Sequence, residues 1–102
     1  MPKLSRDIVD LAKTGHGCTF VIGVKATQGS VFANGIPILR LGDPTLPHTI
    51  PICCPLRCIP HFAKVNMGSG SVFAQSIPVA RDGDSTDFGA LFMGSPNVFA
   101  GG

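Results

Sequence analysis

The sequence contains no tryptophan and no tyrosine, and it carries few charges. Its seven phenylalanines are the only aromatic residues, so no platform for stacking nucleic-acid bases is evident. Charged residues make up 14% of the 102 residues, and the formal net charge is only +2. This charge is too small to indicate binding to nucleic acid or to an anionic membrane. We therefore expect no nucleic-acid partner.

Long hydrophobic stretches are also absent. No unbroken apolar run approaches the roughly 18 residues that a membrane helix needs, and the N-terminal segment lacks the apolar core of a signal peptide. We expect synthesis in the cytoplasm without a signal peptide. A chain of 102 residues buries a modest core, so a metal ion, a disulfide or a partner is expected to stabilise it. The mean hydropathy of +0.34 indicates that apolar surface faces a partner.

The chain repeats itself. Residues 29–43 (GSVFANGIPILRLGD) and 70–84 (GSVFAQSIPVARDGD) are identical at most positions. A truncated copy, GSPNVFAGG, occupies residues 94–102, and residues 6–10 resemble the Arg–Asp ends of the two long copies. Internal repetition fixes the architecture. We therefore expect one domain over residues 1–102, built from three strand–turn–strand modules around a pseudo-threefold axis.

Each long copy is predicted to form a short β-hairpin. Residues 34–35 are Asn-Gly, which favours a type I′ turn because both of its central residues need positive φ. Residues 75–76 are Gln-Ser, so the second turn is expected to be longer or less ideal. Pro37 and Pro78 enter the return strands, where proline indicates edges, strand starts or bulges. Residues 1–14 allow either a short helix or a degenerate copy of the repeat, and we favour the repeat.

Residues 44–61 (PTLPHTIPICCPLRCIPH) differ from the rest of the chain. This segment holds five prolines, three cysteines and two histidines. Regular secondary structure is not expected with so many prolines. A loop of this length in a compact domain is usually functional or held in place by another group. The segment is therefore predicted to be an irregular loop that a bound group organises.

The histidines and cysteines all lie in the first two-thirds of the chain. Imidazole and thiolate together suit zinc, which takes tetrahedral nitrogen and sulfur ligands. Cys58 and His61 lie within chelating distance along the chain, and His16 and His48 follow two Arg–Asp elements at similar spacings. We expect Zn²⁺ bound by these four residues, with Cys54 as the alternative fourth ligand.

The cysteines also allow other interpretations. They can be small buried hydrophobic residues or form disulfides, although cytoplasmic synthesis argues against structural disulfides. Cys18 or Cys58 could act as a nucleophile beside histidine, but a proline-rich loop holds a nucleophile poorly. No phosphate-binding glycine loop is present. We therefore expect no enzymatic activity, and the alternative function is a secreted effector or toxin domain that uses the Cys/His cluster.

The repeats resemble a known family. Residues 37–40 (Pro-Ile-Leu-Arg) and 78–81 (Pro-Val-Ala-Arg) resemble the Pro-Ala-Ala-Arg signature of the PAAR-repeat proteins, and residues 94–99 match the family's closing element. The resemblance covers the chain from Arg6 to the end. It implies an all-β, cone-shaped, pseudo-threefold fold of short strands, with zinc near the point held by three histidines and one cysteine.

The resemblance also implies a function. PAAR proteins cap the puncturing device of type VI secretion systems and of contractile phage tails, with the base of the cone on a trimeric β-helical spike. This chain would then be a structural tip, one copy per trimer, that meets membranes only by transient piercing. It would be delivered into the target cell envelope. Little sequence flanks the repeats, so we expect a bare tip to which any effector cargo binds separately.

The sequence departs from the family pattern at Phe88. The family commonly has cysteine there in an Asp-Cys-Gly context, whereas residues 87–89 read Asp-Phe-Gly. The three histidines correspond by position to the family's histidine-bearing loops. The resemblance therefore leaves the fourth ligand open, and Cys58, Cys54 and a solvent molecule are the candidates.

Overall fold

The computed structural model describes residues 2–52, 56–86 and 89–101 as short β-strands joined by turns, with no helix among them. None of these segments therefore forms an apolar helix long enough to cross a membrane. The strands are β1 (Leu11–Lys13), β2 (Val21–Gly23), β3 (Phe32–Ala33), β4 (Ile36–Pro37), β5 (His48–Ile52), β6 (Arg57–His61), β7 (Phe73–Ala74), β8 (Ile77–Pro78), β9 (Ser85–Thr86) and β10 (Gly89–Leu91).

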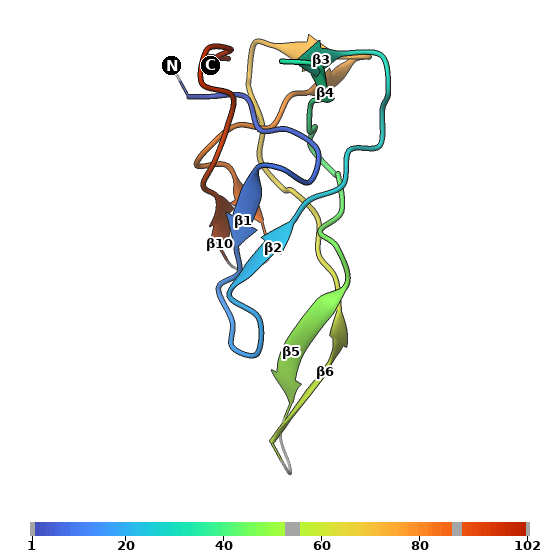
Figure 1. The fold of residues 1–102 in the computed structure, drawn as a ribbon, viewed down its shortest axis with the longest axis vertical. Helices are drawn as coiled ribbons and strands as arrows, with labels where there is room; N and C mark the ends of the chain where they lie inside the picture. The colour runs from blue at the N-terminus through green and yellow to red at the C-terminus, as the bar shows by residue number, and fades with distance from the viewer. Residues whose placement is uncertain (1, 53–55, 87–88, 102) are drawn as a thin grey trace.

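The molecule tapers along its longest axis. Its extents are 44 × 23 × 23 Å. Figure 1 shows the termini, β3 and β4 together at one end, which we call the blunt end, and β5 and β6 reaching to the opposite, narrow end. A four-stranded sheet, in the order β2-β1-β10-β9, lies between them, and each remaining sheet is a two-stranded hairpin. The all-β, tapered fold predicted from the sequence is confirmed.

Three backbone hydrogen bonds form a closed triangle across the long axis. The amide of Leu39 donates to the carbonyl of Ser5 (3.0 Å), and the amide of Ser5 donates to the carbonyl of Ala80 (3.2 Å). The amide of Ala80 returns to the carbonyl of Leu39 (2.9 Å). Each of these residues directly precedes the arginine of one repeat. This backbone triangle relates three equivalent segments by a pseudo-threefold axis, as the repeats predict.

The two ends of the chain together build the third module. In each module, the residue two positions before the arginine donates its backbone amide to the carbonyl of the valine in a Val-Phe pair. These bonds join Ile38 to Val31 (3.1 Å), Val79 to Val72 (3.1 Å) and Leu4 to Val98 (3.0 Å). The first two bonds lie within one hairpin, whereas the third joins the start of the chain to its end. The termini accordingly lie side by side at the blunt end (Figure 1).

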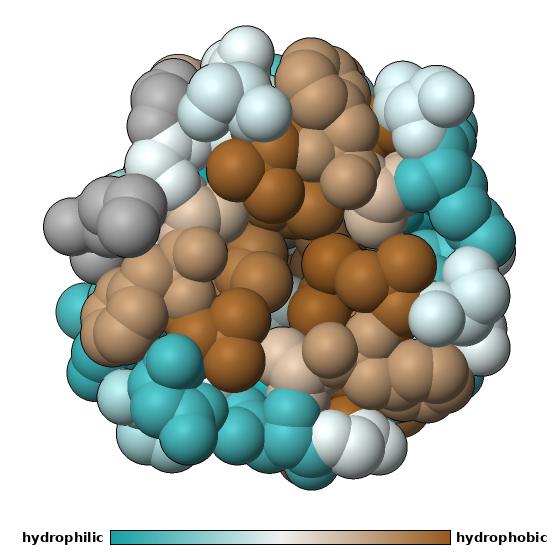
Figure 2. Space-filling view, turned by 90° about the horizontal axis from the view of Figure 1, so that it is seen from above, coloured by the Kyte–Doolittle hydropathy of each residue, from teal (hydrophilic) through white to brown (hydrophobic). Residues whose placement is uncertain are grey.

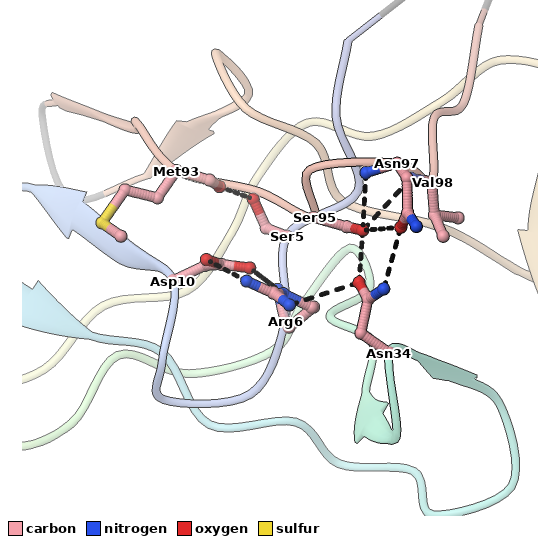
Figure 3. A network of polar contacts seen from close by, with 8 residues as sticks. All are labelled: Ser5, Arg6, Asp10, Asn34, Met93, Ser95, Asn97 and Val98. Carbon is pink, nitrogen blue, oxygen red and sulfur yellow. Dashed lines mark hydrogen bonds and ion pairs between the residues drawn. The ribbon is translucent and has the colours of Figure 1, made fainter.

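A polar network fastens both chain ends to the first hairpin (Figure 3). Asn34 donates from Nδ2 to Oδ1 of Asn97 (2.8 Å) and accepts from Nη1 of Arg6 (3.3 Å). The buried hydroxyl of Ser5 donates to the carbonyl of Met93 (2.6 Å). Side chains therefore supply the links that a covalent connection supplies in the other two modules.

The two hairpin turns have the same geometry despite different sequences. Asn34 and Gly35 have φ values of 56° and 76°, as a type I′ turn requires. Gln75 and Ser76 adopt nearly the same conformation, with φ values of 52° and 67°. The second turn was expected to be longer or less ideal, but it has the same length and nearly the same backbone conformation as the first. Contacts from the neighbouring module hold the less suitable residues in place, because Arg40 donates from Nη1 to Oε1 of Gln75 (3.1 Å).

Two small apolar clusters fill the body of the molecule. Their members come from all three modules and are mostly valine, alanine and leucine, so each cluster is compact. One cluster contains Leu4, Ala33, Ile38, Ala74, Val79 and Ala100, and the other contains Ala12, Val24, Leu39, Val65, Ala80 and Leu91. A core of this size offsets only part of the conformational entropy lost on folding, which leaves a large role for polar contacts and cross-links.

In every module the arginine's backbone amide donates to a nearly buried aspartate. The pairs are Arg6 with Asp10 (3.0 Å), Arg40 with Asp43 (2.8 Å) and Arg81 with Asp84 (2.8 Å). Side-chain hydrogen bonds to Asp10 and Asp84 raise the pKa of Arg6 and Arg81, so these guanidinium groups stay charged. In each module, the hydrogen bond from the arginine amide to the aspartate fixes the turn that follows the arginine.

Among the described residues, the Pro- and Cys-rich segment supplies the longest pair of strands, β5 and β6, so the expectation of an irregular loop is wrong for these residues. Thr49 pairs with Pro60 and Pro51 pairs with Cys58, two positions apart in the register. Antiparallel pairs alternate between hydrogen-bonded and non-hydrogen-bonded types, so both prolines fall in pairs of one type. The amide of Thr49 points outward to Thr19 Oγ1 (3.3 Å). The prolines therefore occupy positions at which no ladder donor is needed.

In one module, the residue two positions after the arginine is strained. Gly42 and Gly83 have φ values of 91° and 96°, and Ile8 takes the equivalent place with φ 61°. The amide of Ile8 donates to the carbonyl of Val24 (2.9 Å), and in the same way the amide of Gly42 donates to the carbonyl of Val65 (2.8 Å). A β-branched residue in this left-handed region is sterically strained.

Replacing Ile8 by glycine should raise the free energy of unfolding by about 0.5–1 kcal/mol, because relief of the left-handed strain exceeds the entropy cost of glycine. Thermal or denaturant unfolding measures the change. Val9→Gly is the matched control, since Val9 is similarly exposed (48% against 44%) and has no positive φ. It should lose about 0.5–1 kcal/mol. Equal destabilisation of both variants would contradict the strain at Ile8.

Candidate metal centre

Three histidines from two separate parts of the chain converge beyond the apolar clusters. His16 lies in residues 14–20, the loop between β1 and β2, which we call the tip loop. His48 begins β5 and His61 ends β6, and the two are directly paired in the hairpin register. Directly opposed residues place their side chains on the same face of a hairpin. The sequence prediction that these three histidines lie together therefore agrees with the geometry.

The ring nitrogens lie close enough for one ion. One nitrogen from each histidine lies within 4.8 Å of the other two. The ring centroids of His16 and His48 are 5.2 Å apart, and that of His61 lies 5.2 Å from His16 and 4.9 Å from His48. His48 is buried, and the other two are half-buried. The centre is thus closed on the side of the core and open toward the surface.

Backbone carbonyls orient two of the imidazoles. Nδ1 of His16 contacts the carbonyl of Gly17 (2.8 Å), and Nδ1 of His48 contacts the carbonyl of Leu46 (2.8 Å). A carbonyl oxygen only accepts, so each Nδ1 carries the proton and each Nε2 is directed to the centre. Such contacts fix the tautomer of metal-binding histidines.

The contact between His16 and His48 tests whether a cation fits. Their Nε2 atoms are 3.3 Å apart. In the neutral tautomer set by the carbonyls, two lone pairs face each other, so a proton or a cation between them is stabilising. Imidazole nitrogen suits zinc and other borderline metal ions. The residues present therefore fit a metal ion.

A cavity of about 510 Å³ opens beside the centre. It lies between the end of β6, with the residues that follow it, and the strands β9 and β10, and His61 forms part of its lining. It is lined by His61, Ala63, Lys64, Asn66, Ser85, Thr86 and Gly89. Apart from His61 the lining offers hydroxyl, amide and ammonium groups, so it leaves room for solvent near the histidines.

Cys58, expected as the thiolate ligand, is joined to Cys18 in a disulfide. The expectation against structural disulfides is therefore wrong. The Cα atoms of Cys18 and Cys58 lie 5.9 Å apart. Alternation along β6 places Cys58 and His61 on opposite faces of the strand. A sulfur in a disulfide is not a thiolate, the form that binds metals. The alternative ligand Cys54 lies outside the described residues, as does Phe88.

The disulfide also bears on the expected alternative function. Both described cysteines are bonded, so the described part of the chain offers no thiol for a Cys–His nucleophile. Sequence reasoning missed a second link beside the centre, in which Thr19 Oγ1 lies 3.0 Å from Thr49 Oγ1. No sequence pattern marks this link, because it depends on how the tip loop packs against β5.

A family model described as the PAAR motif matches residues 12–94. The chain belongs to the PAAR-motif family. No curated protein matches it. The PAAR match includes both long repeats and all three histidines. Membership makes this chain a spike-tip protein of type VI secretion or other contractile systems, a structural role with no positive sign of catalysis.

Proposed function

We propose that this PAAR protein caps a trimeric β-helical spike through its blunt end. Three phenylalanines at this end, one in each module, are 52%, 55% and 44% exposed. They are Phe32, Phe73 and Phe99. Figure 2 looks onto the blunt end and shows hydrophobic residues gathered at its middle, with hydrophilic residues along much of the rim. An apolar face of this kind indicates a protein interface.

The symmetry of this face supports a threefold partner. Each phenylalanine follows a valine that accepts the same backbone hydrogen bond in its own module. A trimer presents three identical surfaces around its axis, and one pseudo-threefold chain can contact all three equally. We therefore propose one copy per trimer. The two-residue strands at this end leave backbone edges to which the spike's last strands can be added.

The proposed mechanism is mechanical. A tapered cap converts the broad end of a spike into a narrow point, and the cross-linked histidine centre stiffens that point. The host machine is a phage tail or a type VI secretion system, and the protein meets membranes only by transient piercing. Delivery into the target cell envelope and binding of effector cargo as a separate chain belong to the same proposal.

Binding to the end of a trimeric β-helical spike tests this function. Light scattering of the complex should give one cap per trimer. Phe73→Asp should weaken binding by about 30-fold or more, because truncation of a central aromatic contact typically costs about 2–4 kcal/mol. Phe62→Asp is the matched control, since Phe62 is 60% exposed but lies next to the histidine centre. Equal binding by wild type and Phe73→Asp would contradict the proposal.

We further propose that His16, His48 and His61 bind Zn²⁺. Support comes from the convergence of their nitrogens within 4.8 Å and from the carbonyls that orient two of them. In the disulfide-bonded form Cys58 offers no thiolate, so Cys54 or solvent from the adjacent cavity would take the fourth position. When bound, the ion ties the tip loop to β5 and β6, which stabilises a chain with a small core.

Metal analysis of protein purified without a histidine tag tests the zinc proposal. We expect about one zinc per chain, and loss of that zinc in His48→Ala with a lower thermal midpoint, because binding energy contributes to folding. Lys64→Ala is the control, since Lys64 lines the cavity without being a proposed ligand. An absence of zinc in the wild type, or an unchanged midpoint in both His48→Ala and chelator, would overturn the proposal.

A further inference from the structure

We propose that the Cys18–Cys58 disulfide positions His16 for metal binding, so that metal affinity depends on the redox state of this cysteine pair. The inference rests on the proposed zinc site, because it concerns how tightly that site binds. The cysteines act here through the histidines rather than as ligands. They are therefore positioning residues, and their contribution is separable from that of the histidines.

The disulfide joins the two chain segments that carry the histidines. Cys18 lies two residues after His16 in the tip loop, and Cys58 lies three residues before His61 in β6. His48 and His61 are already fixed to each other by the β5–β6 register. His16 comes from a different segment, so its distance from the other two depends on how the tip loop is attached to the hairpin.

The tip loop is closed at its base but extends away from its own sheet. The amide of Thr14 donates to the carbonyl of Phe20 (2.9 Å), and the hydroxyl of Thr14 donates to the carbonyl of Thr19. These bonds shape the loop without joining it to β5 or β6. Cys18 has φ 71°, a conformation uncommon outside glycine, so the loop backbone is held in a defined geometry at the cross-link.

Besides the contact between His16 and His48, one covalent link and two hydrogen bonds attach the described tip loop to the hairpin. The covalent link is the disulfide, and the hydrogen bonds join Thr19 Oγ1 to Thr49 Oγ1 (3.0 Å) and to the amide of Thr49 (3.3 Å). Each hydrogen bond contributes about 0.5–1.5 kcal/mol, and both involve the same Thr19 hydroxyl, so they restrain the loop less firmly than a covalent bond does. The covalent link therefore supplies most of the restraint on His16.

The restraint changes the cost of metal binding. With the disulfide formed, folding has already ordered the tip loop, and the metal ion meets three histidines in place. Without it, the ion must order the loop as it binds, and this cost lowers affinity. Loss of groups that orient metal ligands typically weakens metal binding by 10-fold to 100-fold. We expect a change in this range.

The redox dependence has a consequence for delivery. Disulfides are rare in the cytosol and persist in oxidising compartments. Under the proposed function the protein is assembled in the cytosol and delivered into a cell envelope. The metal centre would then bind more tightly after the cysteine pair is oxidised, when the point has to withstand mechanical load.

The experiment compares three forms of the full chain in a Cys53→Ser/Cys54→Ser background, which removes the other two thiols. The forms are the oxidised protein, the same protein reduced by a water-soluble trialkylphosphine, and the Cys18→Ser/Cys58→Ser protein. In the reduction, the phosphine and one water become phosphine oxide, and the disulfide takes up two electrons and two protons to give two thiols. Zinc affinity is measured by competition with a chromophoric chelator.

We expect one zinc per chain in all three forms, with an affinity about 10-fold to 100-fold lower in the reduced and serine forms. The serine form should not respond to phosphine. Ser69→Ala is the control for general destabilisation, because Ser69 is buried and its hydroxyl accepts the amide of Val72 (2.9 Å), away from the histidines. Ser69→Ala should leave zinc affinity unchanged.

Three results would overturn the inference, and they are distinguishable. Affinities within twofold of each other in all forms would remove the positioning role while leaving the zinc site intact. A thiolate-to-cobalt charge-transfer band in the reduced protein loaded with Co²⁺, together with unchanged affinity, would make a cysteine a ligand instead. An absence of metal binding in every form, and also in the protein that keeps Cys53 and Cys54, would overturn the proposed zinc site as well.

Discussion

The backbone triangle of Ser5, Leu39 and Ala80 is the constraint on which the rest of the structure depends. It holds three equivalent segments around one axis, and each segment then directs a Val-Phe pair to the blunt end and a turn toward the narrow end. Because the triangle uses backbone groups, the side chains at its corners differ among serine, leucine and alanine. The fold can therefore keep a threefold framework while the connections between modules diverge.

That divergence is where the candidate metal centre arises. The tip loop follows β1 in one module, and the β5–β6 hairpin occupies the corresponding place in the next. Both extend beyond the apolar clusters, where the chain has little core to hold them. A disulfide and a group of three histidines meet there. Cross-links at the narrow end thus compensate for the hydrophobic packing that a tapering chain cannot provide.

Local sequence patterns predicted the repeated framework well. The duplicated copies predicted the two hairpins and the pseudo-threefold axis, and the histidine positions predicted the cluster. The β5–β6 hairpin was missed because the effect of Pro51 and Pro60 depends on register, which composition does not show. The pairing of Cys58 with Cys18 was missed because strand alternation, which separates Cys58 from His61, follows only once that strand is known.

Native-state hydrogen exchange of the three triangle amides tests the central claim most directly. If the triangle is closed as one cooperative unit, the amides of Ser5, Leu39 and Ala80 should exchange at similar slow rates, through global unfolding. Ser5 is the informative position, because only non-covalent contacts hold its module together. If the amide of Ser5 exchanged about 100-fold or more faster than those of Leu39 and Ala80, the chain ends would open independently of the rest. That result would contradict a framework built on the closed triangle.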